Sequence, residues 1–189
     1  MRRFACVAAA LALLACGAPR AHAQGTSPFS VEGRVGLAFP TGDFGDGLGM
    51  GYELGANAMF NLLPSLGIYA GYTFITFDLD DDVFGDTGDT TFNLQGLDAG
   101  VKLSVPTTAM GPGLTPYLRG GIVYYKGELS DTDFSSDSRL GFQVGAGLDY
   151  PLGRTVSITP EVNYVQIPEK NGSGDASFFK AGFGLRVHL

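Results

Sequence analysis

The sequence contains no tryptophan and only two cysteines, Cys6 and Cys16, which both lie near the N-terminus. If the segment before Gln24 is removed, the remaining chain has no thiol, and this excludes a disulfide framework and cysteine chemistry. Charged residues make up only 16% of the chain, with 12 basic residues against 19 acidic ones. No basic stripe is present, so we do not expect nucleic acid to be a partner.

The first 23 residues have the features of a secretory signal peptide. Met1-Arg2-Arg3 is a positively charged start, Phe4–Ala15 is a short apolar run, and Ala21-His22-Ala23 is a small-x-small cleavage site. The apolar run is shorter than the roughly 20 residues that a helix needs to cross a bilayer. We therefore expect residues 1–23 to be a signal peptide and residues 24–189 to form one mature domain.

A lipoprotein signal is an alternative for the same segment, because Leu13-Leu14-Ala15 precedes Cys16. Cleavage at that point would leave an acylated Cys16 as the first residue of the mature protein. The Ala-x-Ala site and the helix-breaking Pro19 favour ordinary cleavage. The intact mass of the mature protein separates the two, because the lipoprotein would be heavier by its lipid.

Apolar side chains occupy every second position between residues 179 and 189. They are Phe179, Ala181, Phe183, Leu185, Val187 and Leu189. Lys180, Arg186, His188 and two glycines fill the positions between them. A period of two predicts a strand whose two faces meet different solvents. Because one face is charged or glycine and the sequence ends on an apolar residue, we expect a sheet that closes on itself, with its apolar face against lipid.

The residues Lys180-x-Gly182-x-x-Leu185-x-Val187, ending on Leu189, resemble the C-terminal assembly signal of bacterial outer-membrane β-barrels. In that family the last residue is more often aromatic. Over residues 29–189 the pattern resembles the small eight-stranded barrels of the outer membrane protein A-like and OmpW-like superfamily. The resemblance implies a monomer in the bacterial outer membrane. It also implies three partners: outer-membrane lipid, lipopolysaccharide, and the barrel-assembly machinery, which would read the last strand.

The same alternation predicts an all-β fold, an eight-stranded antiparallel up-and-down transmembrane β-barrel. The expected strands are Phe29–Phe39, Gly49–Phe60, Leu66–Phe77, Thr91–Val105, Pro116–Lys126, Arg139–Tyr150, Val156–Ile167 and Phe179–Leu189. Their lengths are close to the about 9–11 residues that a tilted membrane strand requires. Phe92 and Leu94 have the wrong parity for the apolar face, so we expect a bulge near Gln95-Gly96. Pro160 is expected to disturb the local pairing of its strand.

The connections between the expected strands alternate in character. Those after the second, fourth and sixth strands are mostly short and nearly uncharged, whereas the others carry 14 of the 19 acidic residues. These acids are Asp43, Asp46, Asp78, Asp80, Asp81, Asp82, Asp86, Asp89, Glu128, Asp131, Asp133, Asp137, Glu169 and Asp175. Short periplasmic turns and longer outer loops are typical of such barrels. We therefore expect both termini on the periplasmic side and acidic loops outside.

Charged residues also occupy inward positions of the expected strands. The acids are Glu32, Glu53, Asp98, Asp149 and Glu161, and the bases are Arg34, Lys102, Arg119, Arg139, Lys180 and Arg186. The interior of an eight-stranded barrel is just wide enough for side chains, so these charges must pair or stay hydrated. A gated ion path is one interpretation. We favour a paired polar core that plugs the barrel and fixes its register, with Glu161 and Arg186 as the leading pair.

Catalytic and metal sites have little support in the sequence, and we expect no enzyme activity and no cofactor. The one histidine after the signal peptide, His188, lies near the periplasmic rim, and no Gly-x-Ser-x-Gly elbow occurs. The acidic stretch Asp78–Asp89 offers oxygen ligands, but Val83 stands where a calcium-binding loop needs glycine. We expect that stretch to be a solvated loop, with at most weak divalent-cation bridging to lipopolysaccharide phosphates.

The expected role is therefore structural or that of a cell-surface interface. One alternative, implied by the OmpW-like resemblance, is a narrow channel for small or hydrophobic solutes. A second is an adhesion or host-interaction surface formed by the loops. A third is a soluble lipocalin-like periplasmic barrel, in which Phe142, Val144 and Phe183 would point into the centre and Glu53 and Arg186 would face water.

Overall fold

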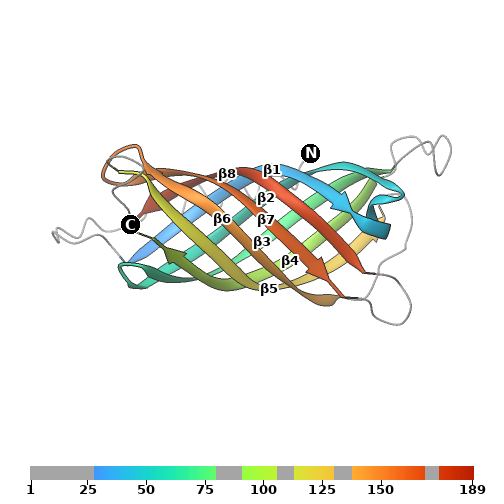
Figure 1. Ribbon diagram of the computed structural model, residues 1–189, viewed down its shortest axis with the longest axis horizontal. Helices are drawn as coiled ribbons and strands as arrows, with labels where there is room; N and C mark the ends of the chain where they lie inside the picture. The colour runs from blue at the N-terminus through green and yellow to red at the C-terminus, as the bar shows by residue number, and fades with distance from the viewer. Residues whose placement is uncertain (1–27, 80–90, 106–112, 130–137, 169–174) are drawn as a thin grey trace, which may run out of the picture.

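The computed structural model describes residues 28–79, 91–105, 113–129, 138–168 and 175–189, which form a closed eight-stranded antiparallel barrel (Figure 1). The strands are β1 (Phe29–Thr41), β2 (Leu48–Leu63), β3 (Leu66–Leu79), β4 (Thr91–Ser104), β5 (Thr115–Leu129), β6 (Arg139–Pro151), β7 (Val156–Ile167) and β8 (Ala176–His188). A 3-10 turn, η1 (Gly42–Gly45), connects β1 to β2. The predicted fold class is confirmed, whereas the expected signal peptide lies outside the described residues. No helix within the described ranges is long and apolar enough to cross a membrane.

The first and last strands close the barrel along an uninterrupted antiparallel ladder, which runs from Ser30 opposite His188 to Thr41 opposite Ser177. Beyond this ladder, the N–H of Leu189 donates to the carbonyl of Phe29 over 3.1 Å. The start of β1 and the end of β8 therefore lie at the same end of the barrel, on the left in Figure 1. We call this the terminal end, and the opposite one the loop end.

The two faces of the strands are oriented as the sequence predicts. Phe142, Val144 and Phe183 point outward and keep 45%, 53% and 62% of their surface exposed. Glu53 and Arg186 point inward, with 8% and 3% exposed. An exterior of this kind is suited to hydrocarbon, and it is the reverse of the arrangement that a soluble lipocalin-like barrel requires.

Glycines on the inner face make room for large side chains from neighbouring strands. A Cβ atom added at Gly100 or at Gly121 would lie 2.7 Å from the hydroxyl oxygen of Tyr69. A Cβ at Gly147 would lie 2.5 Å from the hydroxyl oxygen of Tyr117. The high glycine content therefore permits the close packing of a narrow lumen.

The loop-end half of the lumen is apolar. Its buried members are Ala38, Ile75, Phe77, Leu94, Val123, Tyr125, Val165, Ile167, Ala176 and Phe178, with Phe44, Leu48 and Phe92 packed against them. We call this set the apolar plug.

The bulge predicted near Gln95-Gly96 is wrong, because β4 pairs with β3 and β5 without a register shift. Phe92 and Leu94 belong to the apolar plug, so their parity is that of the inner face.

Pro160 lies where the ladder between β6 and β7 is interrupted. The paired rows stop at Gly147 opposite Glu161 and resume at Tyr150 opposite Ile158 in the same register. Proline has no N–H to donate, so the disturbance expected from the sequence is confined to this gap. On its other side, Pro160 stays opposite Phe183 of β8.

Replacing Gly100 with alanine tests the close packing that this inward glycine allows. The new methyl group would collide with the carbonyl oxygen of Gly120 on β5 and with the hydroxyl of Tyr69, which accepts a hydrogen bond of 2.9 Å from Gln143 across the lumen. We expect Gly100→Ala to lower the free energy of unfolding by about 1–3 kcal/mol, the usual cost of overpacking, measured by urea titration in micelles. Gly33→Ala is the matched control, because no atom lies within 4 Å of the added Cβ. Equal stability of the two variants would contradict this packing.

The charged interior as candidate functional site

Ten of the eleven charged residues singled out from the sequence project into the middle of the lumen, from every strand except β3. They are Glu32, Arg34, Glu53, Asp98, Lys102, Arg119, Asp149, Glu161, Lys180 and Arg186. Five are acidic and five are basic, so the set is formally neutral. All but Asp149 are buried, and the Asp149 side chain is 19% exposed. Arg139 lies elsewhere, at the loop end of β6 opposite Tyr125.

Two arginines and two carboxylates alternate at the centre of the set. The Arg119 guanidinium lies 3.1 Å from Asp98 and 3.3 Å from Glu161. The Arg34 guanidinium lies 3.4 Å and 3.5 Å from the same two carboxylates. These pairs join β1, β4, β5 and β7 across the lumen, and each charge has two opposite charges beside it. Such multiple pairing offsets the large cost of removing ions from water.

Uncharged side chains complete the coordination of these ions. The Tyr117 hydroxyl donates to Glu161 over 2.9 Å, and the Thr73 hydroxyl donates to Asp98 over 3.0 Å. The Arg119 guanidinium carbon lies 3.9 Å from the centre of the Tyr69 ring, a cation–π contact. Sequence reasoning did not single out these residues, although Tyr69, Thr73 and Tyr117 share the inward parity of the charged ones.

Arg186 occupies the terminal-end side of the network and joins three strands. Its guanidinium contacts Glu32 of β1 and Asp149 of β6, and Lys102 lies 3.0 Å from the same Asp149 carboxylate. The predicted pair of Glu161 with Arg186 is wrong, because Glu161 is paired with Arg34 and Arg119 instead. In the ladder between β7 and β8, Arg186 stands opposite Ser157.

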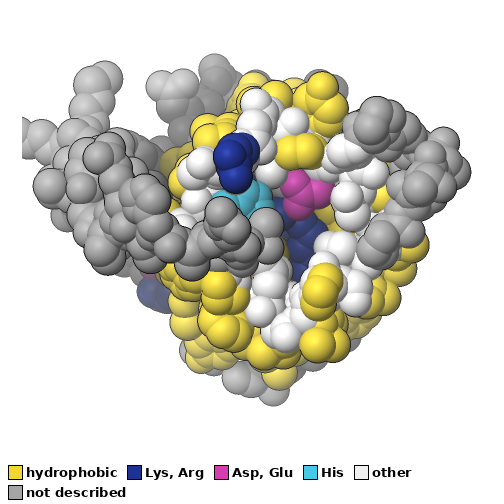
Figure 2. All heavy atoms as spheres, turned by 90° about the vertical axis from the view of Figure 1, so that its left-hand side faces the viewer, with side chains coloured by type: hydrophobic (Ala, Val, Ile, Leu, Met, Phe, Trp, Pro, Cys, Tyr) yellow, Lys and Arg dark blue, Asp and Glu magenta, His cyan; other side chains and the backbone are white. Residues whose placement is uncertain are grey.

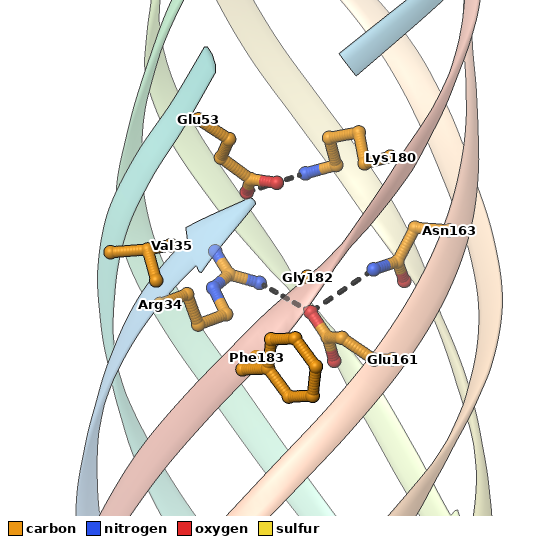
Figure 3. A pocket seen from close by; sticks show the side chains of 8 residues that line it. All are labelled: Arg34, Val35, Glu53, Glu161, Asn163, Lys180, Gly182 and Phe183. Carbon is orange, nitrogen blue, oxygen red and sulfur yellow. Dashed lines mark hydrogen bonds and ion pairs between the residues drawn. The ribbon is translucent and has the colours of Figure 1, made fainter. Parts of the chain in front are cut away.

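A further pair lies toward the loop end, where Lys180 meets Glu53 over 3.0 Å (Figure 3). Figure 3 also shows Arg34 and Asn163 directed at the Glu161 carboxylate, which completes the lining of a small gap. This gap is too small to admit a water molecule. The middle of the barrel is therefore filled by paired side chains.

At the terminal end the lumen widens into a vestibule of about 570 Å³. Figure 2 looks into this end and shows basic, acidic and histidine side chains within a ring of apolar outer surface. Lys102, Asp149 and Arg186 form its floor, and near the mouth the Ser157 hydroxyl lies 3.1 Å from Nε2 of His188. Within the described ranges no group of three histidine, cysteine or acidic side chains could hold a metal ion.

The family model for the outer membrane protein beta-barrel domain matches residues 8–186. This match spans most of the sequence, so the chain belongs to that family. No curated protein matches the sequence.

Solved structures share the fold at low sequence identity. Neisserial surface protein A is 19% identical, with a TM-score of 0.71 over 88% of this chain and 100% of its own. The N-terminal β-barrel domain of OprF from Pseudomonas aeruginosa is 17% identical, with a TM-score of 0.57 over 86% and 98%. The attachment invasion locus protein Ail of Yersinia pestis is 15% identical, with a TM-score of 0.52 over 86% and 99%. At these identities the likeness concerns the fold alone, that of a small outer-membrane barrel.

Removing Arg119 tests the buried network. Arg119→Met keeps most of the side-chain volume but leaves Asp98 and Glu161 with one cation fewer. Breaking a buried pair in this way should cost about 3–5 kcal/mol of unfolding free energy, measured by urea titration in micelles. Lys126→Met is the control, because its pair with Glu128 is 42% and 36% exposed and should contribute at most about 1 kcal/mol. A loss at Arg119 no larger than that of the control would contradict a network that supports the fold.

Proposed function

We propose that this chain is a closed barrel of the outer membrane with a structural or cell-surface role, rather than a channel or an enzyme. The observation that carries the proposal is the filled middle of the lumen. Arg34, Arg119, Asp98 and Glu161 meet there from four strands, and the adjoining gap is too small to admit a water molecule. A solute would have to separate several buried ion pairs at once, which is costly in a medium of low polarity.

A second obstruction supports the same conclusion. Phe44 on η1 covers the apolar plug, with its ring centre 5.6 Å from Phe77, 6.0 Å from Phe92 and 6.2 Å from Phe178. Gly42 allows the chain to turn there, with a left-handed φ of 62°. A hydrated ion that passed the charged network would therefore still meet an apolar, closely packed segment.

The two ends of the barrel suit different surroundings. Asp43, Asp46 and Asp78 are exposed at the loop end, and most of the other acids predicted there lie outside the described residues. We infer that the loop end faces the cell exterior and the terminal end faces the periplasm, following the asymmetry usual in such barrels. The acidic loops would then form the surface that the cell presents.

Adhesion is the second candidate, supported by this concentration of charge at one end. An acidic rim would favour partners with basic patches and repel polyanions. Deletion of residues 80–90 or 130–137 should then abolish binding of such a partner without unfolding the barrel. Unchanged binding would leave the structural role as the better account.

Planar-bilayer recording tests the closed lumen. We expect the purified, folded protein to give no stepwise ion conductance, and Phe44→Ala to give none either, because the charged network still fills the middle. A large-pore porin in the same bilayer is the positive control. Regular conductance steps from the unmodified protein would contradict the proposal and favour the narrow channel.

A further inference from the structure

Two buried donors that line the terminal-end vestibule have no hydrogen-bond partner among the described residues. They are the hydroxyl of Ser30 on β1 and the Nε of Arg186 on the neighbouring strand β8. Ser30 is fully buried, Arg186 is 3% exposed, and both lie on the inner face of the barrel. A buried donor without an acceptor has lost its bond to water and gained nothing in return. An acceptor in the vestibule would remove this cost.

The vestibule differs from the middle of the lumen because it has room for a ligand. Arg34 also has an unpartnered Nε, but it lines the gap that excludes water. The vestibule has a volume of about 570 Å³. Figure 2 shows basic and acidic side chains at the bottom of its opening. A small solute that enters from the terminal end can therefore reach charged groups.

The floor of the vestibule carries two cations and one carboxylate, Lys102, Arg186 and Asp149. Asp149 accepts hydrogen bonds from both cations. Among the described residues it is the one carboxylate within ion-pair distance of Lys102. Glu32, the other partner of Arg186, does not line the vestibule. Because an ammonium has three N–H donors, Lys102 retains donors for a further acceptor, and the floor favours an anion.

The Asp149 carboxylate restricts which anions fit. Its side chain is 19% exposed, so an anion beside Lys102 and Arg186 also meets this negative charge. A ligand that carries an O–H avoids the repulsion, because it can donate a hydrogen bond to the carboxylate. Inorganic phosphate keeps such a proton, and phosphate monoesters keep one on a large share of molecules at about pH 6. Sulfate and phosphate diesters have none to donate.

We propose that the vestibule binds inorganic phosphate or a small phosphate monoester. The phosphate oxygens would pair with Lys102 and Arg186 and accept from the Ser30 hydroxyl, while the phosphate O–H would donate to Asp149. Such a site goes beyond the structural role proposed above. It requires neither one orientation of the barrel nor a conducting lumen, because the ligand enters and leaves at the same end.

Isothermal titration calorimetry of the folded protein in maltoside micelles, with inorganic phosphate added at about pH 6, tests this site. We expect saturable binding by the unmodified protein and an about tenfold weaker affinity after Ser30→Ala, the usual effect of losing one hydrogen bond to a charged group. The Ser30 hydroxyl has no partner within the described protein, so this variant should fold normally. Ser177→Ala is the matched control. It removes a hydroxyl that lies 3.1 Å from that of Thr41 at the loop end, and it should leave the affinity unchanged.

A second variant removes the cation. Lys102→Met should weaken phosphate binding by about tenfold or more, while Asp149 keeps its pair with Arg186. Heat-modifiable gel migration verifies that each variant is folded. Unmodified protein that binds no phosphate, or that binds it no more tightly than the folded Ser30→Ala variant does, would overturn the proposal.

Competing anions identify the ligand class. Sulfate should bind at least about tenfold more weakly than phosphate, because it has no proton to donate to Asp149. Glycerol 3-phosphate, a monoester, should bind, whereas dimethyl phosphate, a diester like a phospholipid head group, should not. Equal affinity for sulfate and phosphate, or for the monoester and the diester, would contradict the role of Asp149 and overturn the proposal. Conductance is a separate readout, so an open lumen would not count against phosphate binding.

Discussion

The structure depends on pairing opposite charges in the middle of a lumen that is too narrow there for water to hydrate them. Eight strands enclose little more than the side chains that line them, so the ions in the middle must find their partners across the lumen. Arg119 and Arg34 share Asp98 and Glu161, and Arg186 connects Glu32 to Asp149. These pairs join strands that are far apart in sequence. The closed barrel is therefore stabilised only when these particular charges meet.

The remaining features follow from this constraint. Inward glycines leave room for the rings of Tyr69 and Tyr117. The Tyr69 ring contacts the Arg119 guanidinium, and the Tyr117 hydroxyl donates to Glu161. Toward the loop end the charges give way to the apolar plug, which Phe44 covers. The outer face carries mostly large apolar side chains, as an exterior in contact with hydrocarbon requires. A closely packed lumen and an exposed outer surface are compatible with a protein that acts through its surface.

Sequence alternation alone predicted the strands and their faces, because a period of two reports which residues share a side. It could not predict which inward ions touch. Glu161 and Arg186 lie on adjacent strands, but the register places Gly182 opposite Glu161 and Ser157 opposite Arg186. The side chains then reach across the lumen instead, a result of the tilt and stagger of the strands. Phe92 and Leu94 were misassigned for a different reason: the inner face was assumed to be polar along its whole length.

Quenching of introduced tryptophans by brominated lipid tests the central claim most directly, because the protein has no tryptophan of its own. Phe183→Trp places the indole on the outward face, and Tyr117→Trp places it in the filled lumen. The claim predicts strong quenching of the first variant in brominated-lipid vesicles and almost none of the second. Strong quenching at position 117 with little at position 183 would show that the apolar face does not meet lipid.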